Sequence, residues 1–381
     1  MRVHSIDRWR LSVGGATFAL AIILAAVSSS AAAAPGKLDL GLTYKQDVLR
    51  IFSGGKDSGD AAPGMVQFNG LFKNHNDKLK VALLGTFGGA ISKRLGALQG
   101  PSDIEAHNTF RLYELYYDHT FGKSGLSTRL GLQDYSALFN TIKPAQLFLN
   151  TSFGVAPTIS QAYLSIYPVT TLGAVLHWKA PQSPLYVLAG IYDGEPGLPG
   201  HPGGTHVELA NGDGAFTDFE IGITGKHYKL GIGGWSSTRR YTGLAGRPRN
   251  SNHGVYLMGA AQVYGGQSKP TLHVFLQLGD AEGDRNKMSQ YIGAGVKLTH
   301  FVPGRPKDAL ALGMARVLPS DLFARVKPGA AAAETVYELT YQAKITQRLS
   351  LQPDVQYIDD PGALNNIPNA WVAGFRVKYK L

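Results

Sequence analysis

The last eleven residues of the chain, Trp371 to Leu381 (WVAGFRVKYKL), carry the pattern that decides the fold. Apolar or aromatic side chains occupy every second position, and Arg376, Lys378 and Lys380 occupy positions between them. Successive side chains of a β-strand point to opposite faces of a sheet, so this segment is predicted to be a strand with one apolar and one charged face. Trp371 and Tyr379 are roughly 20 Å apart along such a tilted strand, close to the spacing of the two aromatic girdles of a membrane barrel.

The same alternation recurs throughout the chain from residue 37, whereas a helical period does not. Sixteen segments are predicted as strands, near residues 37–49, 65–72, 79–87, 109–121, 126–133, 171–179, 185–193, 216–224, 227–236, 254–264, 270–279, 289–299, 308–317, 334–345, 348–358 and 369–381. The connections between them alternate between long and short, which is typical of an outer-membrane barrel. A soluble all-β protein also alternates, but sixteen long strands would enclose a space too wide for side chains to fill. The expected fold class is all-β, a transmembrane up-and-down antiparallel β-barrel of about 16 strands.

Composition excludes several other classes of protein. The 381 residues contain no Cys, so disulfide scaffolds, thiolate metal sites and Cys nucleophiles are excluded. Glycine is abundant at 47 residues, and Gly231, Gly233, Gly293 and Gly295 fall on the predicted inward face, where missing side chains would leave a channel open. The formal net charge of +10 taken alone would suggest a nucleic-acid partner. We expect none, because the charge lies largely in predicted loops and on the inward face.

The N-terminal segment has the features of an export signal. Arg2, Arg8 and Arg10 precede the apolar run Phe18–Val27, and a run of alanines ending at Ala34 offers a small-residue cleavage site. The apolar run is ten residues long, whereas a spanning helix needs about 20. Residues 1–33 are therefore predicted to be a cleaved signal peptide and residues 34–381 a barrel domain in the outer membrane of a Gram-negative cell.

Two loop motifs resemble ligand sites. Ser53–Ser58 (SGGKDS) resembles a phosphate-binding loop, but the following GDAAPG cannot begin a useful helix, so we interpret the motif as a surface loop. His201 and His206 lie in the Gly/Pro-rich stretch Gly194–Gly203 or just beyond it. Two loop histidines without a carboxylate partner would make a poor metal site. No cofactor and no metal are therefore predicted.

Enzymatic chemistry has one weak candidate. Ser127 and His119, on either side of a predicted turn, are the nearest approach to the Ser/His pair that a membrane-embedded hydrolase would need. Both residues fit a turn at the edge of the barrel equally well. The protein is therefore predicted not to be an enzyme, and a barrel hydrolase stays as an alternative.

Several longer stretches, distributed over the chain, carry a family resemblance. They include Gly100–Phe121 (GPSDIEAHNTFRLYELYYDHTF), Arg129–Asn140 (RLGLQDYSALFN), Leu147–Thr158 (LFLNTSFGVAPT) and Leu351–Gly362 (LQPDVQYIDDPG). Together they resemble the carbohydrate-selective porin family of the OprB type. The resemblance implies a sixteen-stranded outer-membrane barrel, passive uptake of glucose and related sugars, and a monomer rather than a trimer. Leu381 departs from the family, whose chains tend to end in Phe, and the departure bears on the signal for barrel assembly.

The predicted pore lining combines inward-facing strand residues with the longest connection, residues 134–170, which is expected to fold inward and narrow the lumen. The candidates are Glu114, Asp118, Arg129, Gln133, Phe148, Asn150, Trp235, Glu338 and Arg376. Both charge signs are present, which suits hydrogen bonding to neutral polyols better than strong ion selection. Phe148 and Trp235 would offer aromatic surfaces to a sugar, and Asn150 an amide. Each of these residues could instead serve loop packing or salt bridges in the wall.

The predicted function is an outer-membrane channel for passive diffusion of mono- or small oligosaccharides. A general, weakly anion-selective porin is the alternative within the same class, and a surface barrel with a plugged lumen is an alternative from another class. The expected partners are sugar solutes, outer-membrane lipid and lipopolysaccharide, and the barrel-assembly machinery, which would recognise the C-terminal strand.

Overall fold

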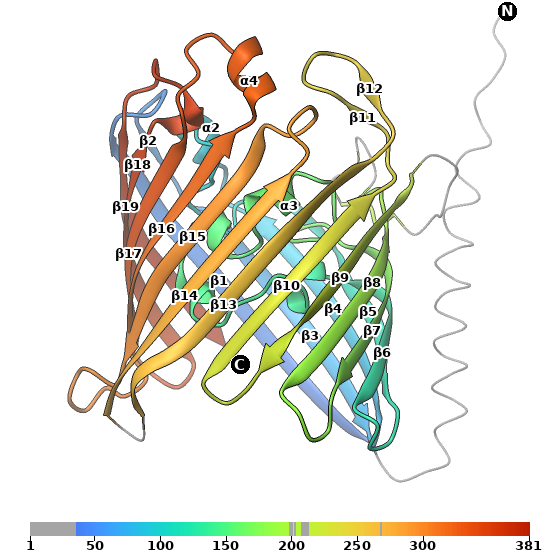
Figure 1. The fold of residues 1–381 in the computed structure, drawn as a ribbon. Helices are drawn as coiled ribbons and strands as arrows, with labels where there is room; N and C mark the ends of the chain where they lie inside the picture. Colours follow the sequence, from blue (N-terminus) through green and yellow to red (C-terminus); the bar gives the residue numbers. More distant parts are fainter. Residues whose placement is uncertain (1–35, 198–200, 202, 207–212, 267–268) are drawn as a thin grey trace, which may run out of the picture.

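The computed structural model describes residues 36–197, 201, 203–206, 213–266 and 269–381, and the predicted signal peptide lies outside them. Within the described residues, sixteen long strands form one antiparallel barrel (Figure 1). They are β1 Lys37–Ser53, β3 Gly64–Asn74, β4 Asp77–Phe87, β5 Thr109–Thr120, β6 Leu126–Gln133, β7 Thr171–Lys179, β8 Leu185–Asp193, β9 Ala215–Thr224, β10 Tyr228–Ser237, β13 Asn252–Gly266, β14 Lys269–Ala281, β15 Met288–Thr299, β16 Ala309–Pro319, β17 Glu334–Lys344, β18 Leu349–Asp359 and β19 Ala370–Lys380. The predicted all-β barrel of sixteen strands is confirmed.

The barrel closes through its first and last strands. Each long strand pairs with the next one along the chain, and β1 pairs with β19 from Thr43 opposite Lys380 to Ser53 opposite Trp371. An unpaired strand edge would expose a row of backbone donors and acceptors, and this closing pair removes it. The up-and-down order predicted from the alternating connections is therefore the order observed.

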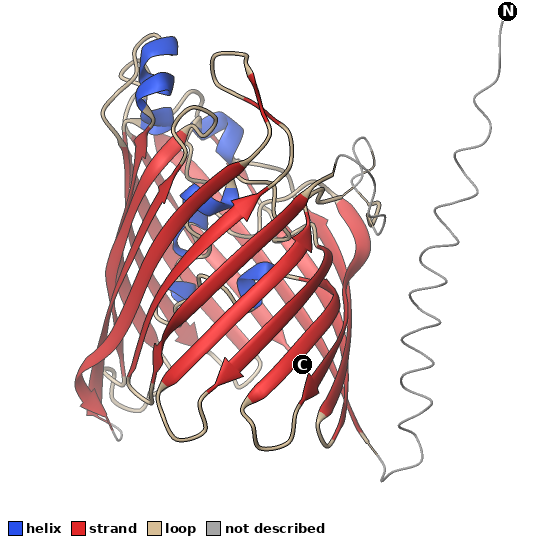
Figure 2. Cartoon of the chain, turned by 45° about the vertical axis from the view of Figure 1, so that its right-hand side comes forward, coloured by secondary structure: helices blue, strands red, loops and turns tan. Residues whose placement is uncertain are grey.

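The shorter elements lie in the connections. They are β2 Gly59–Ala61, α2 Ser92–Leu95, η1 Tyr135–Ala137, η2 Ala145–Leu147, η3 Thr151–Phe153, α3 Pro157–Ser160, β11 Tyr241–Thr242, β12 Pro248–Arg249, α4 Asp321–Val326 and η4 Pro361–Ala363. We call the end of the barrel with the long connections the loop rim and the opposite end the turn rim. Figure 2 shows short helices inside the barrel outline and another, α4, at the loop rim. No helix in the described part of the chain is long and apolar enough to cross a membrane.

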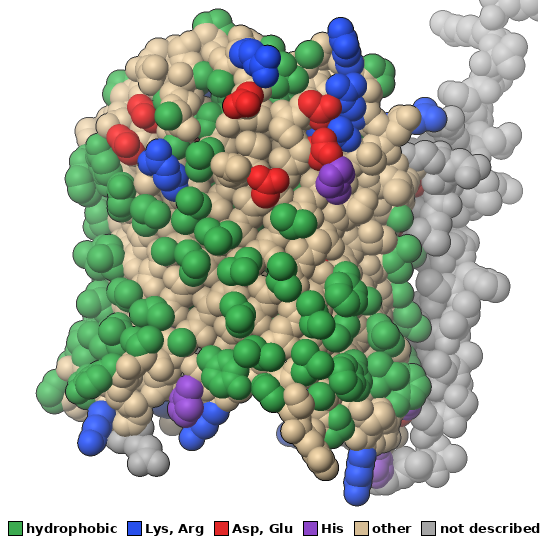
Figure 3. Space-filling model, viewed as in Figure 1, with side chains coloured by type: hydrophobic (Ala, Val, Ile, Leu, Met, Phe, Trp, Pro, Cys, Tyr) green, Lys and Arg blue, Asp and Glu red, His purple; other side chains and the backbone are tan. Residues whose placement is uncertain are grey.

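The outer wall is apolar, as the alternating pattern of the last strand predicts. Trp371 and Phe375 are 50% and 40% exposed, whereas Arg376, which follows Phe375 and points to the opposite face, is buried on the inner side. Figure 3 shows hydrophobic side chains over the middle of the visible wall, with charged side chains nearer the two rims. Such an outer band, with polar groups inside, matches a barrel surrounded by lipid.

Glycines on the inner wall have a different role from the one predicted. A Cβ added to Gly233 would lie 2.2 Å from the Tyr256 ring, and one added to Gly295 would lie 2.7 Å from the Phe275 ring. These glycines therefore make room for the aromatic ring of the residue paired with them on the neighbouring strand. The expectation that they leave the lumen open is wrong at these positions.

Candidate functional site

Two connections fold into the barrel. Residues 134–170, between β6 and β7, reach strands well separated around the barrel: Tyr291 on β15 donates to the Ser152 carbonyl at 2.8 Å, and Gln352 on β18 donates to the Leu147 carbonyl at 2.6 Å. Residues 88–108, between β4 and β5, lie beside them, since the Asp103 amide donates to the Leu149 carbonyl at 2.7 Å. The inward course of residues 134–170 is as predicted, whereas that of residues 88–108 was not predicted.

Glu338 on β17 holds the longer connection through backbone amides. Its two carboxylate oxygens accept hydrogen bonds from the N–H groups of Leu149 at 2.6 Å and Asn150 at 3.0 Å, and the side chain is fully buried. A buried N–H group without an acceptor costs about 1–3 kcal/mol, so both bonds hold the connection to the wall. The side-chain amide of Asn150 donates to Gln356 at 3.1 Å. Both residues, predicted to line the pore, thus join the connection to the wall in this structure.

Two further wall glutamates bind loop amides in the same way. Glu334, at the start of β17, accepts from the N–H groups of Leu98 at 2.7 Å and Gln99 at 2.8 Å in the shorter connection. Glu220 on β9 accepts from the Asn140 N–H at 2.9 Å. Both carboxylates are fully buried. We call Glu220, Glu334 and Glu338 the anchor glutamates. The alternating pattern of their strands indicates that they face inward, but not that they bind loop amides.

Arg376 lies at the seam where β1 meets β19. Its guanidinium forms a bidentate pair with Asp47 of β1, at 2.6 and 2.7 Å, and also contacts Asp103 in the shorter connection. Ser102 donates to the same Asp47 carboxylate at 2.6 Å. Burial alone would raise the pKa of Asp103, but the positive charges of Arg376 and Lys45 outweigh it, and that pKa is lowered from its usual value. This cluster therefore ties the seam to an inward-folded connection.

The charged residues predicted on β5 and β6 face inward and form a pair. Arg129 donates to Asp118 through two nitrogens, at 2.7 and 3.1 Å, and its guanidinium lies 4.0 Å from the centre of the Tyr116 ring. Both charged side chains remain partly exposed. Glu114 is buried nearby, and Gln133 is buried with its amide bonded to the backbone of β7 at 2.9 Å. Asp118 and Arg129 are thus the two predicted site residues that keep access to the lumen.

The two predicted aromatic surfaces are enclosed by protein. Phe148 stacks on Phe153 with ring centres 4.2 Å apart, and Trp235 stacks on Phe216 at 5.8 Å. Phe148 and Trp235 are each 2% exposed, so neither ring is accessible to a solute in this conformation. A role for them as sugar platforms stays a prediction.

A set of lysines lines the inner wall toward the turn rim. Lys378 on β19 is paired in register with Lys45 on β1, and the other three project from β4, β15 and β17. All five are partly exposed, and in the described residues none forms an ion pair with a carboxylate. We call Lys45, Lys80, Lys297, Lys344 and Lys378 the lumen lysines.

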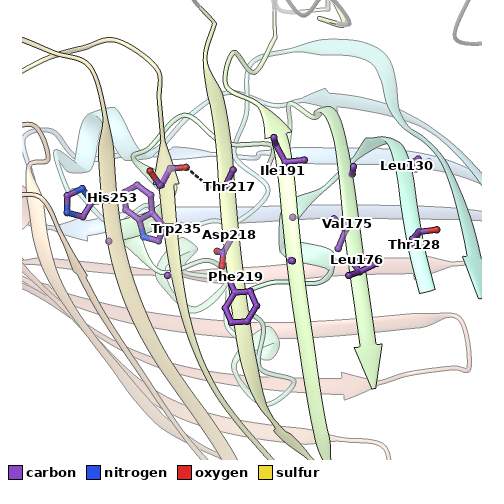
Figure 4. Close-up of a pocket in the computed structure, with 16 residues that line it drawn as sticks. Thr128, Leu130, Val175, Leu176, Ile191, Thr217, Asp218, Phe219, Trp235 and His253 are labelled. Atoms are coloured by element: carbon purple, nitrogen blue, oxygen red, sulfur yellow. Dashed lines mark hydrogen bonds between the residues drawn. The ribbon is translucent and has the colours of Figure 1, made fainter. Parts of the chain in front are cut away.

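One hollow in the wall faces away from the lumen. It has a volume of about 700 Å³ and lies across β6 to β13, where Leu130, Leu176, Ile191 and Phe219 project outward (Figure 4). Small residues on these strands, such as Gly234 and Gly254, also line it. An apolar hollow on the outer wall of a barrel meets lipid, so it is no part of a solute path.

The structure places the candidate Ser/His pair and the loop histidines in different environments. His119 is bonded to Asp77 at 2.7 Å, and Ser127 donates to a backbone carbonyl of β7, so the two do not form a Ser/His pair. The expectation that the loop histidines lack a carboxylate partner is wrong for His206, which lies beside Asp193 and Asp213. The two aspartates are 13 and 7 residues away in sequence and meet His206 only because β8 and β9 are neighbours.

A closed barrel of sixteen strands with an apolar outer wall, a polar inner wall and inward-folded connections is an outer-membrane porin. Residues 69–381 match the family described as carbohydrate-selective porin, OprB family. The chain therefore belongs to this family, which is one of channels and not of enzymes. The resemblance noted in the sequence is confirmed.

Individual proteins show the same relationship. The chain is 28% identical to Porin B of Pseudomonas aeruginosa over 156 residues, which cover 36% of this chain and 34% of Porin B, so the match spans about a third of that curated relative. The high-pH structure of Pseudomonas putida OprB superimposes with a TM-score of 0.82 at 19% identity, covering 90% of this chain and 94% of that one. The outer membrane channel DcaP of Acinetobacter baumannii superimposes at 0.58 and 10% identity, covering 91% and 97%. At these identities the structural likeness shows the fold.

Proposed function

We propose that the protein is a passive channel through which small sugars cross the outer membrane along the barrel lumen. The observation that carries the proposal is the pair of inward-folded connections, residues 88–108 and 134–170, that the anchor glutamates hold. These connections narrow the lumen of a wide barrel, as a passive channel for small solutes requires. Membership of a family described as carbohydrate-selective supports a sugar as the solute. A neutral polyol can exchange hydrogen bonds with water for bonds to donors and acceptors on the lumen wall.

Asp118 and Arg129 are the residues we place along the sugar path. They face the lumen as a hydrogen-bonded pair and remain partly exposed, whereas most other predicted site residues are buried. A carboxylate offers only acceptors and a guanidinium only donors, so the pair can bind adjacent hydroxyls of a sugar. We propose that this pair, together with the two connections, sets the selectivity.

Conductance measurements in planar bilayers test the proposal. Purified protein should form open channels whose ionic current falls as millimolar glucose is added, because a sugar in the narrow segment excludes ions. The folded state is verified first by heat-dependent migration in detergent gels. Channels that glucose and other small sugars do not block, combined with a strong chloride preference, would overturn the sugar channel. Liposomes that fail to swell in sugar solution would point instead to a plugged surface barrel.

The lumen lysines favour a second candidate, a general diffusion porin with a weak preference for anions. Fixed positive charges along a pore attract anions and repel cations, and the five lumen lysines form no ion pair in the described residues. The zero-current potential across a KCl gradient distinguishes the two. Anion preference with glucose block supports the sugar channel with a charge bias, and anion preference without block supports the general porin.

The remaining assignments follow from export and fold. We propose that residues 1–33 are removed during export, that lipid and lipopolysaccharide surround the barrel, and that the assembly machinery binds β19. We also propose a monomer. N-terminal sequencing of protein from outer membranes tests the cleavage, and light scattering in detergent tests the monomer; a mature chain that retains residues 1–33 or a trimer would contradict these assignments.

A further inference from the structure

The connection between β8 and β9 brings three potential metal ligands together at the loop rim. Asp193 is the last residue of β8 and is paired in register with Ala215, the first residue of β9, while Asp213 precedes that strand by two residues. His206 lies between the two aspartates in sequence and returns to them in space. The pairing of two strand ends therefore fixes two of the ligands, and the loop supplies the third.

The three side chains meet at one point. The Nε2 atom of His206 lies 3.1 Å from Oδ2 of Asp213 and 3.4 Å from Oδ2 of Asp193. One ligand atom from each residue falls within 4.8 Å of the others. The side chain of Asp193 is fully buried, that of His206 is 8% exposed and that of Asp213 is 20% exposed, so the cluster is largely closed to solvent.

A second observation points to a ligand in the cluster. Oδ1 of Asp193 accepts a hydrogen bond from the Glu195 N–H at 3.1 Å, but Oδ2, the oxygen that faces His206, is buried and receives no hydrogen bond from the described residues. A buried carboxylate oxygen without a partner is costly. A cation between Oδ2 and the imidazole would satisfy this oxygen and balance the two carboxylates.

The spacing and the donor atoms fit zinc. Zinc binds imidazole nitrogen and carboxylate oxygen at about 2.0–2.2 Å in a tetrahedron, which places neighbouring ligand atoms roughly 3.3–3.5 Å apart. The two nitrogen–oxygen separations observed, 3.1 and 3.4 Å, are close to this value. Calcium would require six to eight oxygen ligands at longer distances, whereas the described residues of this cluster offer one nitrogen and two carboxylates. Three protein ligands would leave the fourth position to water.

We propose that Asp193, His206 and Asp213 form a Zn²⁺ site that fastens the β8–β9 connection at the loop rim. The site lies close to the inward-folded residues 134–170, because Arg111 on β5 donates to the carbonyl of Gly204 in the β8–β9 connection and, at 3.4 Å, to that of Pro168. Zinc binding therefore holds a loop that contacts the end of the constricting connection.

Titration of untagged, refolded full-length barrel with ZnCl₂ after EDTA treatment tests the proposal. The wild type should bind one Zn²⁺ per chain, and its thermal unfolding midpoint should rise with zinc and fall with EDTA, since a ligand that binds only the folded state stabilises it. The binding measurement does not depend on sugar transport. Failure of the zinc site would therefore leave the proposed function unaffected, and the reverse also holds.

Two variants give the matched comparison. His206→Ala should weaken zinc binding by about tenfold or more, whereas His201→Ala, which removes an exposed histidine of the same connection, should bind as the wild type does. Asp213→Asn repeats the test if His206→Ala fails to fold. Zinc binding unchanged in both cluster variants would overturn the site. A wild type that binds no zinc at micromolar concentration would also overturn it, and the three side chains would then form only a charged hydrogen-bond network.

Discussion

The two halves of the lumen use charged residues in opposite ways. Toward the loop rim, the anchor glutamates are fully buried, and each accepts hydrogen bonds from loop N–H groups. Toward the turn rim, the lumen lysines are partly exposed and form no ion pair in the described residues. All eight side chains point inward from their strands. The alternation of side chains along a strand therefore predicts that they face the lumen, but it does not predict what they bind there.

The difference follows from the chemistry of the folded connections. A loop that crosses a lumen exposes backbone N–H groups that need acceptors, and a carboxylate can accept two at once. An ammonium group can only donate, so a lysine can bind a loop only through its carbonyls, as Lys229 on β10 does with the Thr141 carbonyl at 3.0 Å. The lumen lysines form no ion pair in the described residues, so their charges are placed to bias the ions that pass.

The largest effect should come from Glu338→Ala. The variant leaves the buried N–H groups of Leu149 and Asn150 without their acceptor, which costs about 3 kcal/mol or more and frees the middle of residues 134–170 from its contact with β17. Open-channel conductance in planar bilayers should rise by about twofold or more as the narrowing is lost, and Glu338→Gln should have a smaller effect because it keeps one acceptor. Asp60→Ala, at an exposed position of the loop rim, is the control. Unchanged conductance with normal folding would contradict the anchoring role.

A smaller effect is expected when the charges of two lumen lysines are reversed. The double variant Lys45→Glu and Lys378→Glu places two negative charges side by side across the β1–β19 pair. The zero-current potential in a KCl gradient should change sign from anion preference to cation preference, while conductance stays within about twofold. Lys327→Glu, exposed in the loop after α4, should leave the potential as in the wild type. A double variant that keeps the wild-type potential would show that these lysines lie outside the ion path.

A moderate, pH-dependent effect is expected from Asp103→Asn. The pKa of Asp103 is lowered in the folded protein, so its contact with Arg376 adds stability above the usual carboxyl value of about 3.9 and loses it as the pH falls through the lowered value. The variant should unfold at a lower temperature than the wild type at pH 7, and the difference should shrink at pH 3. Asp57→Asn, exposed at the loop rim, should behave as the wild type. An equal difference at both pH values would disprove the charge interaction.

The smallest effect is expected from Trp235→Phe. The indole ring is enclosed against Phe216, so the substitution should leave glucose block within about twofold of the wild type. Arg129→Gln, which alters a side chain that remains partly exposed in the lumen, is the matched variant and should reduce the block more strongly. A loss of block in Trp235→Phe alone would revive the aromatic platform predicted from the sequence.

The strands could be predicted because the period of two assigns each side chain to the wall or the lumen before any pairing is known. Trp371 and Arg376 illustrate this, since their predicted sides are the observed ones. The anchors could not be predicted, because the partners of Glu338 are main-chain amides 188 and 189 residues away, and an amide leaves no mark on the sequence. The cluster around His206 was missed for a related reason, since it depends on the pairing of two strand ends.

Anchoring through main-chain amides has a consequence for how such channels can diversify. Every residue type except proline supplies an N–H group, so the bonds of Glu334 and Glu338 to Leu98, Gln99, Leu149 and Asn150 do not depend on the side chains at those four positions. Exposed positions of the two connections, such as Gln146, can therefore vary without loss of these bonds, and with them the solutes that the channel admits. Substitutions in the two connections can therefore change the selectivity of this barrel during evolution while the residues of the wall stay the same.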